Sequence, residues 1–360
     1  MNAAVRTAVN LLLLAASVLL CLGMAEAYLV WDNRRPQIPP TRLQLGGGEF
    51  RVWERAETLS DLRNAAIVVG DSFAAGEACA DGRNYPTYFN QLASRAPAPY
   101  RVVNLGVPGA DPLMYLQLVE GLVDSGRVPA AAVITLYSND VELTCSSCRY
   151  LERMRADPSF SPEDIARLEA LCSGCKSKAQ DGRAAGAYAH YGVLRRTHTW
   201  LHQNFYIYGL LRETAVAASM QAGLNVGFGR SAYPALWQAH SGLEFKVVRF
   251  SLASIRDRLR EAGVQRMMVV IYPDIENLKP ENPYVAIYSG VAQDLASTLG
   301  VPVFSGYPAF LESSEARTHM PFSLVDHHPS CKAHELFANW VYGRFEQVRG
   351  DAALVPVRSR

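Results

Sequence analysis

A serine follows a short apolar run early in the chain. Residues 67–69 are apolar β-formers, and Gly70, Asp71 and Ser72 come directly after them. A serine hydroxyl is a weak nucleophile until a neighbouring base removes its proton. Because open α/β sheets place their chemistry at the carboxyl ends of their strands, we expect Ser72 to lie at that edge. The sequence therefore predicts a nucleophilic serine if other residues supply a base, an orienting acid and oxyanion donors.

A base and an acid occur together near the end of the chain, in Asp326-His327-His328-Pro329. An imidazole titrates near neutral pH, which suits a general base. Asp326, two residues before His328, can reach back to that ring in a tight turn and fix its tautomer. We predict that Ser72, Asp326 and His328 form a catalytic triad, with His327 as the alternative base.

Oxyanion donors are available after two further apolar runs. Gly106 follows residues 100–105, and Asn139 follows residues 131–137. A glycine lets the backbone approach a ligand closely, and an asparagine amide can donate to a developing oxyanion. Both residues are also common in ordinary turns. We predict an oxyanion hole made by the Ser72 backbone N–H, Gly106 and Asn139.

The order of these blocks resembles the SGNH/GDSL hydrolase family. Gly-Asp-Ser, Gly, Asn-Asp and Asp-x-His follow one another over residues 65–140 and 243–346, and the middle of the chain is not covered. The resemblance implies a serine esterase that needs no cofactor. It also favours His328 over His327, because Pro329 follows the catalytic histidine in the family. The chain departs from the family at Tyr137, where glycine is usual.

Apolar runs alternate with helical patterns through much of the chain. Such alternation predicts an α/β protein with a parallel sheet and right-handed crossovers. Five strands suit the flavodoxin-like order, a three-layer sandwich whose switch point lies beside the first strand. The fold that the resemblance implies agrees. The predicted strands cover residues 65–69, 100–105, 131–137, 266–272 and 301–304.

Composition divides the chain into four parts. Residues 28–60 are rich in proline and glycine and are predicted to be a linker. The hydrolase domain is expected over residues 61–140 and 243–350. Residues 141–242 leave the α/β alternation and are predicted to be a helical insertion beside the active site. A helix is expected to begin at Ser161, which is followed by proline and two acids.

The N-terminal part carries a targeting signal. Residues 7–25 hold no charge and are preceded by Arg6, and Ala25-Glu26-Ala27 fits a signal-peptide cleavage site. The same stretch is nearly long enough for a membrane anchor. Residues 1–27 are therefore predicted to be a signal peptide or an N-terminal membrane helix, which could associate with a membrane. Either way the protein is expected outside the cytoplasm.

Six cysteines follow Cys21, an even number that favours disulfides in an oxidising compartment. Two Cys-x-x-Cys pairs could instead hold zinc. A further disulfide between Cys79 and Cys331 is predicted, because one cysteine lies shortly after Ser72 and the other shortly after His328. The two Cys-x-x-Cys pairs are Cys145 with Cys148 and Cys172 with Cys175.

We expect an extracytoplasmic serine esterase acting on a small-molecule, glycan or lipid ester, such as an O-acyl group. One alternative is an O-acyltransferase that modifies an exported or cell-surface polysaccharide with the same triad. A second is a non-catalytic binding module on the same fold. With a net charge of only +1, the protein has no strong positive electrostatic potential, so no nucleic-acid partner is expected.

Overall fold

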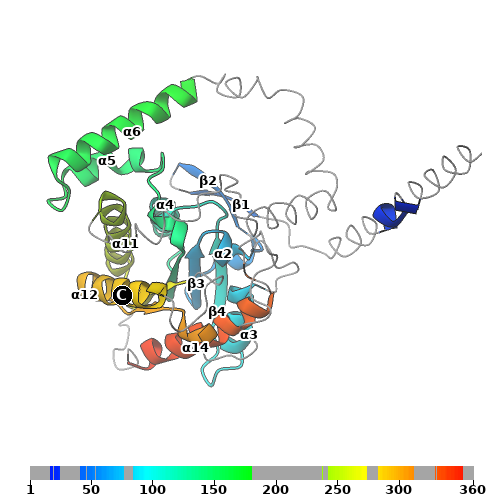
Figure 1. Cartoon of the computed structure of the whole chain (residues 1–360). Helices are drawn as coiled ribbons and strands as arrows, with labels where there is room; N and C mark the ends of the chain where they lie inside the picture. Colours follow the sequence, from blue (N-terminus) through cyan, green and yellow to red (C-terminus); the bar gives the residue numbers. More distant parts are fainter. Residues whose placement is uncertain are drawn as a thin grey trace, which may run out of the picture. The chain divides into compact units, whose positions relative to one another are not determined.

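Five parallel strands form the centre of the fold (Figure 1), in the order β4-β3-β5-β6-β7. In this computed structural model, residues 17–18, 20–24, 41–45, 47–52, 54–76, 84–180, 237, 242–273, 283–311, 329 and 331–351 are described. The strand order is the flavodoxin-like one, so the predicted topology is confirmed. The strands are β3 (Ala65–Gly70), β4 (Arg101–Gly106), β5 (Ala131–Leu136), β6 (Met267–Ile271) and β7 (Val303–Ser305).

The central strands are buried along their whole length. Every residue of β3, β5 and β6 is buried. A parallel strand covered by helices on both faces reads as one continuous apolar run, which is why these strands could be located from the sequence.

Helices cover both faces of the sheet. α3 (Tyr85–Ala93) packs against α14 (Cys331–Asp351), and α4 (Pro112–Asp124) packs against α11 (Leu243–Glu261), which in turn contacts α12 (Pro283–Leu299). In a flavodoxin-like order with right-handed crossovers, the first pair lies on one face and the other three helices lie on the opposite face. A short helix, α13 (Pro308–Leu311), contacts α14. The predicted three-layer architecture is confirmed.

An antiparallel hairpin occupies much of the segment that we predicted to be a linker. β1 (Thr41–Leu45) pairs with β2 (Gly48–Val52), and Leu43 and Phe50 are buried in the core. Gly47 turns the chain with a φ of 72°. The linker prediction is therefore wrong for this part, because the glycines form a hairpin turn between strands whose apolar residues alternate. Residues 28–40 lie outside the described residues.

The insertion begins with two helices, α5 (Ser147–Arg155) and α6 (Pro162–Gln180). Ser161 and Asp164 cap α6 reciprocally: the Asp164 N–H donates to the serine hydroxyl, and the Ser161 N–H donates to the carboxylate. The Lys246 ammonium pairs with Asp164 at 2.6 Å and links α6 to α11. The described part of the predicted insertion therefore contains helices at residues 147–155 and 162–180. Residues 181–236 lie outside the described residues.

Most of the predicted targeting segment, residues 1–27, also lies outside the described residues. Residues 17–18 and 20–24 are helical. Within the part of the chain that the structure describes, no helix has both the length and the hydropathy of a membrane span. The signal peptide and the membrane anchor stay predictions.

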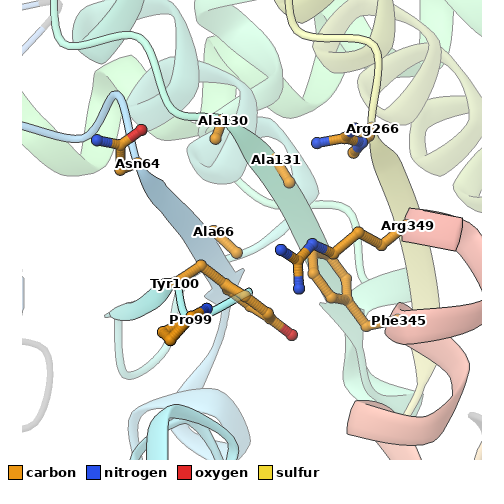
Figure 2. Close-up of a pocket in the computed structure, with 9 residues that line it drawn as sticks. All are labelled: Asn64, Ala66, Pro99, Tyr100, Ala130, Ala131, Arg266, Phe345 and Arg349. Carbon is orange, nitrogen blue, oxygen red and sulfur yellow. The ribbon is translucent and has the colours of Figure 1, made fainter. Parts of the chain in front are cut away.

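A hollow of about 420 Å³ lies at the amino edge of the sheet (Figure 2). Ala66 and Ala131, at the starts of β3 and β5, form part of its lining. Tyr100 and Phe345 line it as well, and Arg349 reaches it from the last turn of α14. The hollow lies at the opposite ends of the strands from Ser72.

Candidate active site

Ser72 begins α2 (Ser72–Ala75), a single helical turn at the carboxyl end of β3. The Asp71 side chain caps this turn by accepting the Phe73 N–H at 2.9 Å. Gly76 ends it with a φ of 82°, and the Gly76 N–H donates to the Ser72 carbonyl at 2.8 Å. Ser72 is 9% exposed. The structure thus places the predicted nucleophile at the expected edge of the sheet.

Small residues let α2 pack closely on the strand ends. A Cβ on Gly106 would lie 2.3 Å from the Ala75 nitrogen, and a Cβ on Gly70 would lie 2.7 Å from the Ala74 Cβ. The Asn104 side-chain amide also donates to the Ala75 carbonyl at 3.4 Å. Glycine at these two strand ends therefore fits the close approach of the helix that carries Ser72.

The Gly106 amide is engaged inside the protein. The Gly106 N–H donates to Asn104 Oδ1 at 2.9 Å. Three residues later in the same loop, Gly109 is exposed, has a φ of 71° and has open space where a side chain would stand. Among the described residues, the Gly109 N–H has no hydrogen-bond partner. Gly109 is thus a second candidate donor, which the Pro-Gly turn in the sequence could have indicated.

Asn139 lies in η2 (Ser138–Val141), the turn after β5. Its Oδ1 atom is buried, and the side-chain amide has no partner within the part of the chain that the structure describes. Asn139 as a whole is half-buried, and its amide N–H groups can donate to a ligand at this edge of the sheet. Because β3 and β5 are parallel neighbours, the turn with Asn139 and the turn with Ser72 follow strand ends on the same edge.

Tyr137 stands where glycine is usual in the family that the sequence resembles, and it covers the nucleophile turn. Its ring stacks on Phe73, with the ring centroids 3.5 Å apart and the planes at 21°. Tyr272 also contacts the Phe73 ring, at a centroid distance of 5.4 Å. The residue after Ser72 is therefore held between aromatic side chains.

A second buried carboxyl group supports the Asn139 turn. Asp140 accepts the Tyr137 N–H at 2.7 Å and the Tyr115 hydroxyl at 2.8 Å, and it is 2% exposed. Burial and then the charge of Asp71 raise the pKa of Asp140 well above its usual value. The shift has this direction because a second buried negative charge beside Asp71 would be costly.

Trp237 holds the Asn139 turn from the other end of the insertion. Its indole Nε1–H donates to the Ser138 carbonyl at 2.8 Å, and the ring is fully buried against Tyr288 and Phe245. Sequence reasoning missed this residue, because nothing local indicates a contact across 99 positions.

Two disulfides join α5 and the turn before it to α6. Cys145 is bonded to Cys175, and Cys148 is bonded to Cys172. The four sulfur atoms are therefore bonded to one another, and the zinc alternative is wrong. The disulfide alternative for these four cysteines is confirmed.

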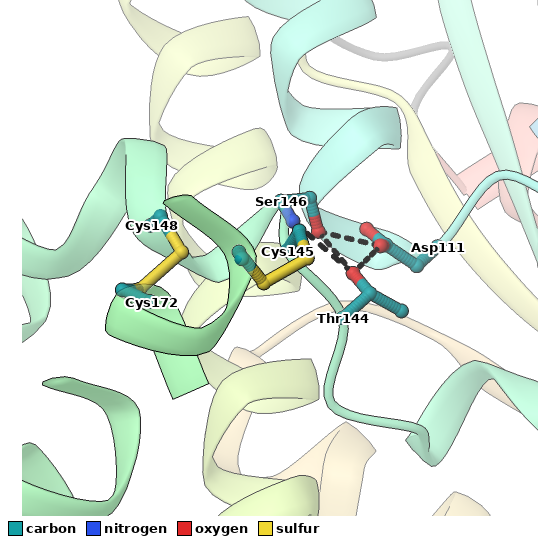
Figure 3. The surroundings of a disulfide bond; sticks show 7 residues. Asp111, Thr144, Cys145, Ser146, Cys148 and Cys172 are labelled. Carbon is teal, nitrogen blue, oxygen red and sulfur yellow. Dashed lines mark hydrogen bonds between the residues drawn. A yellow bond between two sulfur atoms is a disulfide. The ribbon is translucent and has the colours of Figure 1, made fainter. Parts of the chain in front are cut away.

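The first disulfide lies beside a hydrogen-bond cluster at the start of α4 (Figure 3). The Ser146 hydroxyl donates to the Asp111 carboxylate at 2.5 Å, and the Thr144 hydroxyl donates to the same carboxylate oxygen. Asp111 also caps α4 by accepting the Met114 N–H at 2.9 Å. The root of the insertion is thereby fastened to the loop that contains Gly109.

Several predicted residues lie outside the described residues: Asp326, His327, His328 and Cys79. The triad and the Cys79–Cys331 bridge therefore stay predictions. Cys331 itself is disulfide-bonded. His334, one helical turn further on, is fully buried beside Tyr85 and Tyr272, as expected of a packing residue.

No protein-family model and no curated protein matches the chain. Solved structures do. TesA shares 14% identity, with 79% of this chain and 99% of TesA covered and a TM-score of 0.40. A lipolytic protein of the G-D-S-L family from Veillonella parvula DSM 2008 shares 11% sequence identity. The match covers 79% of this chain and 98% of that protein, with a TM-score of 0.38. AlinE4, an SGNH-hydrolase family esterase, shares 14% sequence identity. The match covers 81% of this chain and 98% of AlinE4, with a TM-score of 0.32. The last two structures carry the names of the family that the sequence blocks resemble.

Proposed function

We propose that the protein is a serine esterase that hydrolyses a carboxylic ester through an acyl-enzyme on Ser72. The observation that carries the proposal is that Ser72 and Asn139 follow the carboxyl ends of two neighbouring parallel strands, and that the Asn139 side-chain amide has no partner among the described residues. Acyl transfer requires a nucleophile and a hydrogen-bond donor for the oxyanion, and both stand at this edge of the sheet. The alternative is that Ser72 only caps a helix. That alternative would not explain why the Asn139 side chain has no partner among the described residues.

In the proposed mechanism, His328 removes the Ser72 hydroxyl proton while Oγ attacks the ester carbonyl carbon. Asp326 orients the imidazole. The carbonyl oxygen becomes an oxyanion and accepts hydrogen bonds from the Ser72 N–H, the Asn139 amide and an N–H of the loop at Gly106 or Gly109. The carbon–oxygen bond to the alcohol then breaks, and His328 gives the alcohol its proton.

Water completes the cycle. His328 removes a proton from water, the hydroxide attacks the acyl carbon, and the bond to Ser72 Oγ breaks as the serine regains its proton. The products are the alcohol and a carboxylic acid, which ionises to a carboxylate. No cofactor takes part in these steps.

We place the protein outside the cytoplasm. The two disulfides in the described residues support this, because disulfides persist in oxidising compartments. We further propose that the ester is an O-acyl group on a small molecule, a glycan or a lipid.

Labelling with a serine-directed phosphonate tests the proposal. The expected result is one covalent adduct, located on Ser72 by peptide mapping and absent from the Ser72→Ala variant. Lack of labelling in folded wild-type protein would overturn the esterase and leave the binding module. A polysaccharide acceptor can also be added to the reaction. If less acid is then released and the acyl group is found on the polysaccharide, the protein is instead an O-acyltransferase.

A further inference from the structure

We propose that the hollow at the amino edge of the sheet binds a small organic carboxylate. The hollow is lined by Ala66 and Ala131 near the starts of β3 and β5. β3 has six residues, so its two ends are about 17 Å apart. Ser72 follows the other end, and the inferred site is therefore separate from the candidate active site.

Small side chains create the space. Ala66, Ala130 and Ala131 line the hollow, whereas the later positions of β3 and β5 carry valine, isoleucine and leucine. Tyr100 and Phe345 add aromatic walls (Figure 2). A volume of about 420 Å³ lies within the range of small-molecule sites. The shape and lining suit a compact ligand with an apolar body.

Two polar groups of the lining lack partners. Within the described part of the chain, neither the Arg266 guanidinium nor the Asn64 side-chain amide has a hydrogen-bond or ion-pair partner. The Arg266 backbone is held in place, because its carbonyl accepts the Ala132 N–H at 2.9 Å. A guanidinium presents a fork of donors that matches a carboxylate.

Arg349, the second arginine of the lining, already has partners within the protein. The Arg349 Cζ atom lies 4.4 Å above the Tyr100 ring, and Nη2 donates to the Ala98 carbonyl at 2.7 Å. Arg349 also pairs with Glu346 at 3.3 Å, and the Tyr100 hydroxyl donates to the same carboxylate at 2.9 Å. Glu346 offsets one of the two positive charges. The remaining positive charge, on Arg266, matches a ligand with a single negative charge.

Calorimetric titration of the full chain with benzoate tests the inference, with benzyl alcohol as the neutral analogue. We expect saturable benzoate binding and at least roughly 10-fold weaker binding of benzyl alcohol, because a charge-assisted hydrogen bond is lost. Arg266→Gln should weaken benzoate binding by about 10-fold. Arg51→Gln is the matched control, since Arg51 is an exposed arginine on β2, and it should leave binding unchanged.

A second variant tests the space rather than the charge. Ala130 is exposed at the rim of the hollow, so Ala130→Leu should fold normally by circular dichroism yet reduce benzoate binding. Ser72→Ala should leave benzoate binding intact. Loss of binding in Ser72→Ala would show that benzoate occupies the candidate active site, and the inference would fail whether or not the esterase proposal stands.

Two further results would overturn the inference. The first is the absence of saturable benzoate binding below about 10 mM, the range of weak small-molecule complexes. The second is tighter binding of phenyl phosphate than of benzoate, which would indicate a phosphate site.

Discussion

The two edges of one parallel sheet differ in how their polar groups are used. At the carboxyl edge, polar groups stand at the end of β4 and in the turns after β3 and β5, and many of them bond one another. The Gly106 N–H donates to Asn104, and the Tyr137 N–H donates to Asp140. At the amino edge, alanines at the strand starts leave a hollow lined by the partnerless cation of Arg266, as judged over the described residues.

The difference shows what each edge is suited for. Catalysis needs groups held in place before the substrate arrives, and a network of internal hydrogen bonds supplies this at the carboxyl edge. Binding an anion needs space and an uncompensated positive charge, and the amino edge has both. Substitutions at each edge test whether the two edges are functionally separate.

The largest effect is expected for Ser72→Ala. Turnover of nitrophenyl acetate should fall by roughly 10⁴-fold or more, because the nucleophile and its base act as one unit. The thermal unfolding temperature should change little, and benzoate binding at the amino edge should persist. Retained turnover would show that the carboxyl edge does not act through this serine.

Asn139→Ala should lower kcat by roughly 10²–10³-fold with little change in KM, the usual result of removing one oxyanion donor. Asn64→Ala is the matched control, since it removes an amide of the amino edge that has no partner among the described residues. Steady-state kinetics should show an effect only at the carboxyl edge. An equal loss of kcat in Asn139→Ala and Asn64→Ala would show that the two edges are not functionally separate.

Trp237→Phe should lower kcat by roughly 10-fold, because the hydrogen bond to the Ser138 carbonyl that positions Asn139 is lost. Trp340→Phe is the control: the Trp340 indole N–H has no partner in the part of the chain that the structure describes. In an Asn139→Ala background, Trp237→Phe should add no further loss. An additive loss would mean that Trp237 does not act through Asn139.

Trp237→Phe also removes part of a buried ring, so a second replacement separates packing from hydrogen bonding. Benzothienylalanine at position 237 keeps the ring shape without the N–H, and its kcat should match that of the phenylalanine variant. A wild-type rate would assign the effect to packing.

The smallest effect is a pH dependence of stability at Asp140. Its raised pKa means that the folded protein binds this proton more tightly than the unfolded chain does. The free energy of unfolding therefore falls as pH rises above the unfolded pKa of about 4. An asparagine side chain does not ionise, so Asp140→Asn should gain stability relative to wild type between about pH 5 and about pH 8 in urea unfolding.

Asp61→Asn is the control for that experiment. Asp61 precedes β3 at the amino end, and hydrogen bonds from Arg63 lower its pKa to about 2. A lowered pKa gives stability that is lost only in acid, so the effect of Asp61→Asn should be constant between about pH 5 and about pH 8. A pH-independent effect of Asp140→Asn as well would contradict the raised pKa of the buried Asp140 carboxyl.

Local sequence patterns determined most of the sheet and half of the candidate site. Five apolar runs became the five strands, because a strand buried on both faces must be apolar throughout. Ser72 and Asn139 could be placed because each follows such a run, and parallel strands bring their carboxyl ends to one edge. The hairpin of β1 and β2 was missed because its glycines outweighed the alternation of Leu43 and Leu45 with polar residues.

Only the tertiary structure decided the rest. The spacing of two Cys-x-x-Cys pairs is compatible with zinc or with several disulfide pairings, and the packing of α5 on α6 selects Cys145–Cys175 and Cys148–Cys172. The engaged amide of Gly106, the Trp237 bond and the amino-edge hollow likewise depend on which side chains meet. The periodicity of apolar residues in a sequence indicates which face of a helix or strand is buried. It does not indicate which residues far apart in the sequence come into contact. Those contacts are determined by how the elements pack.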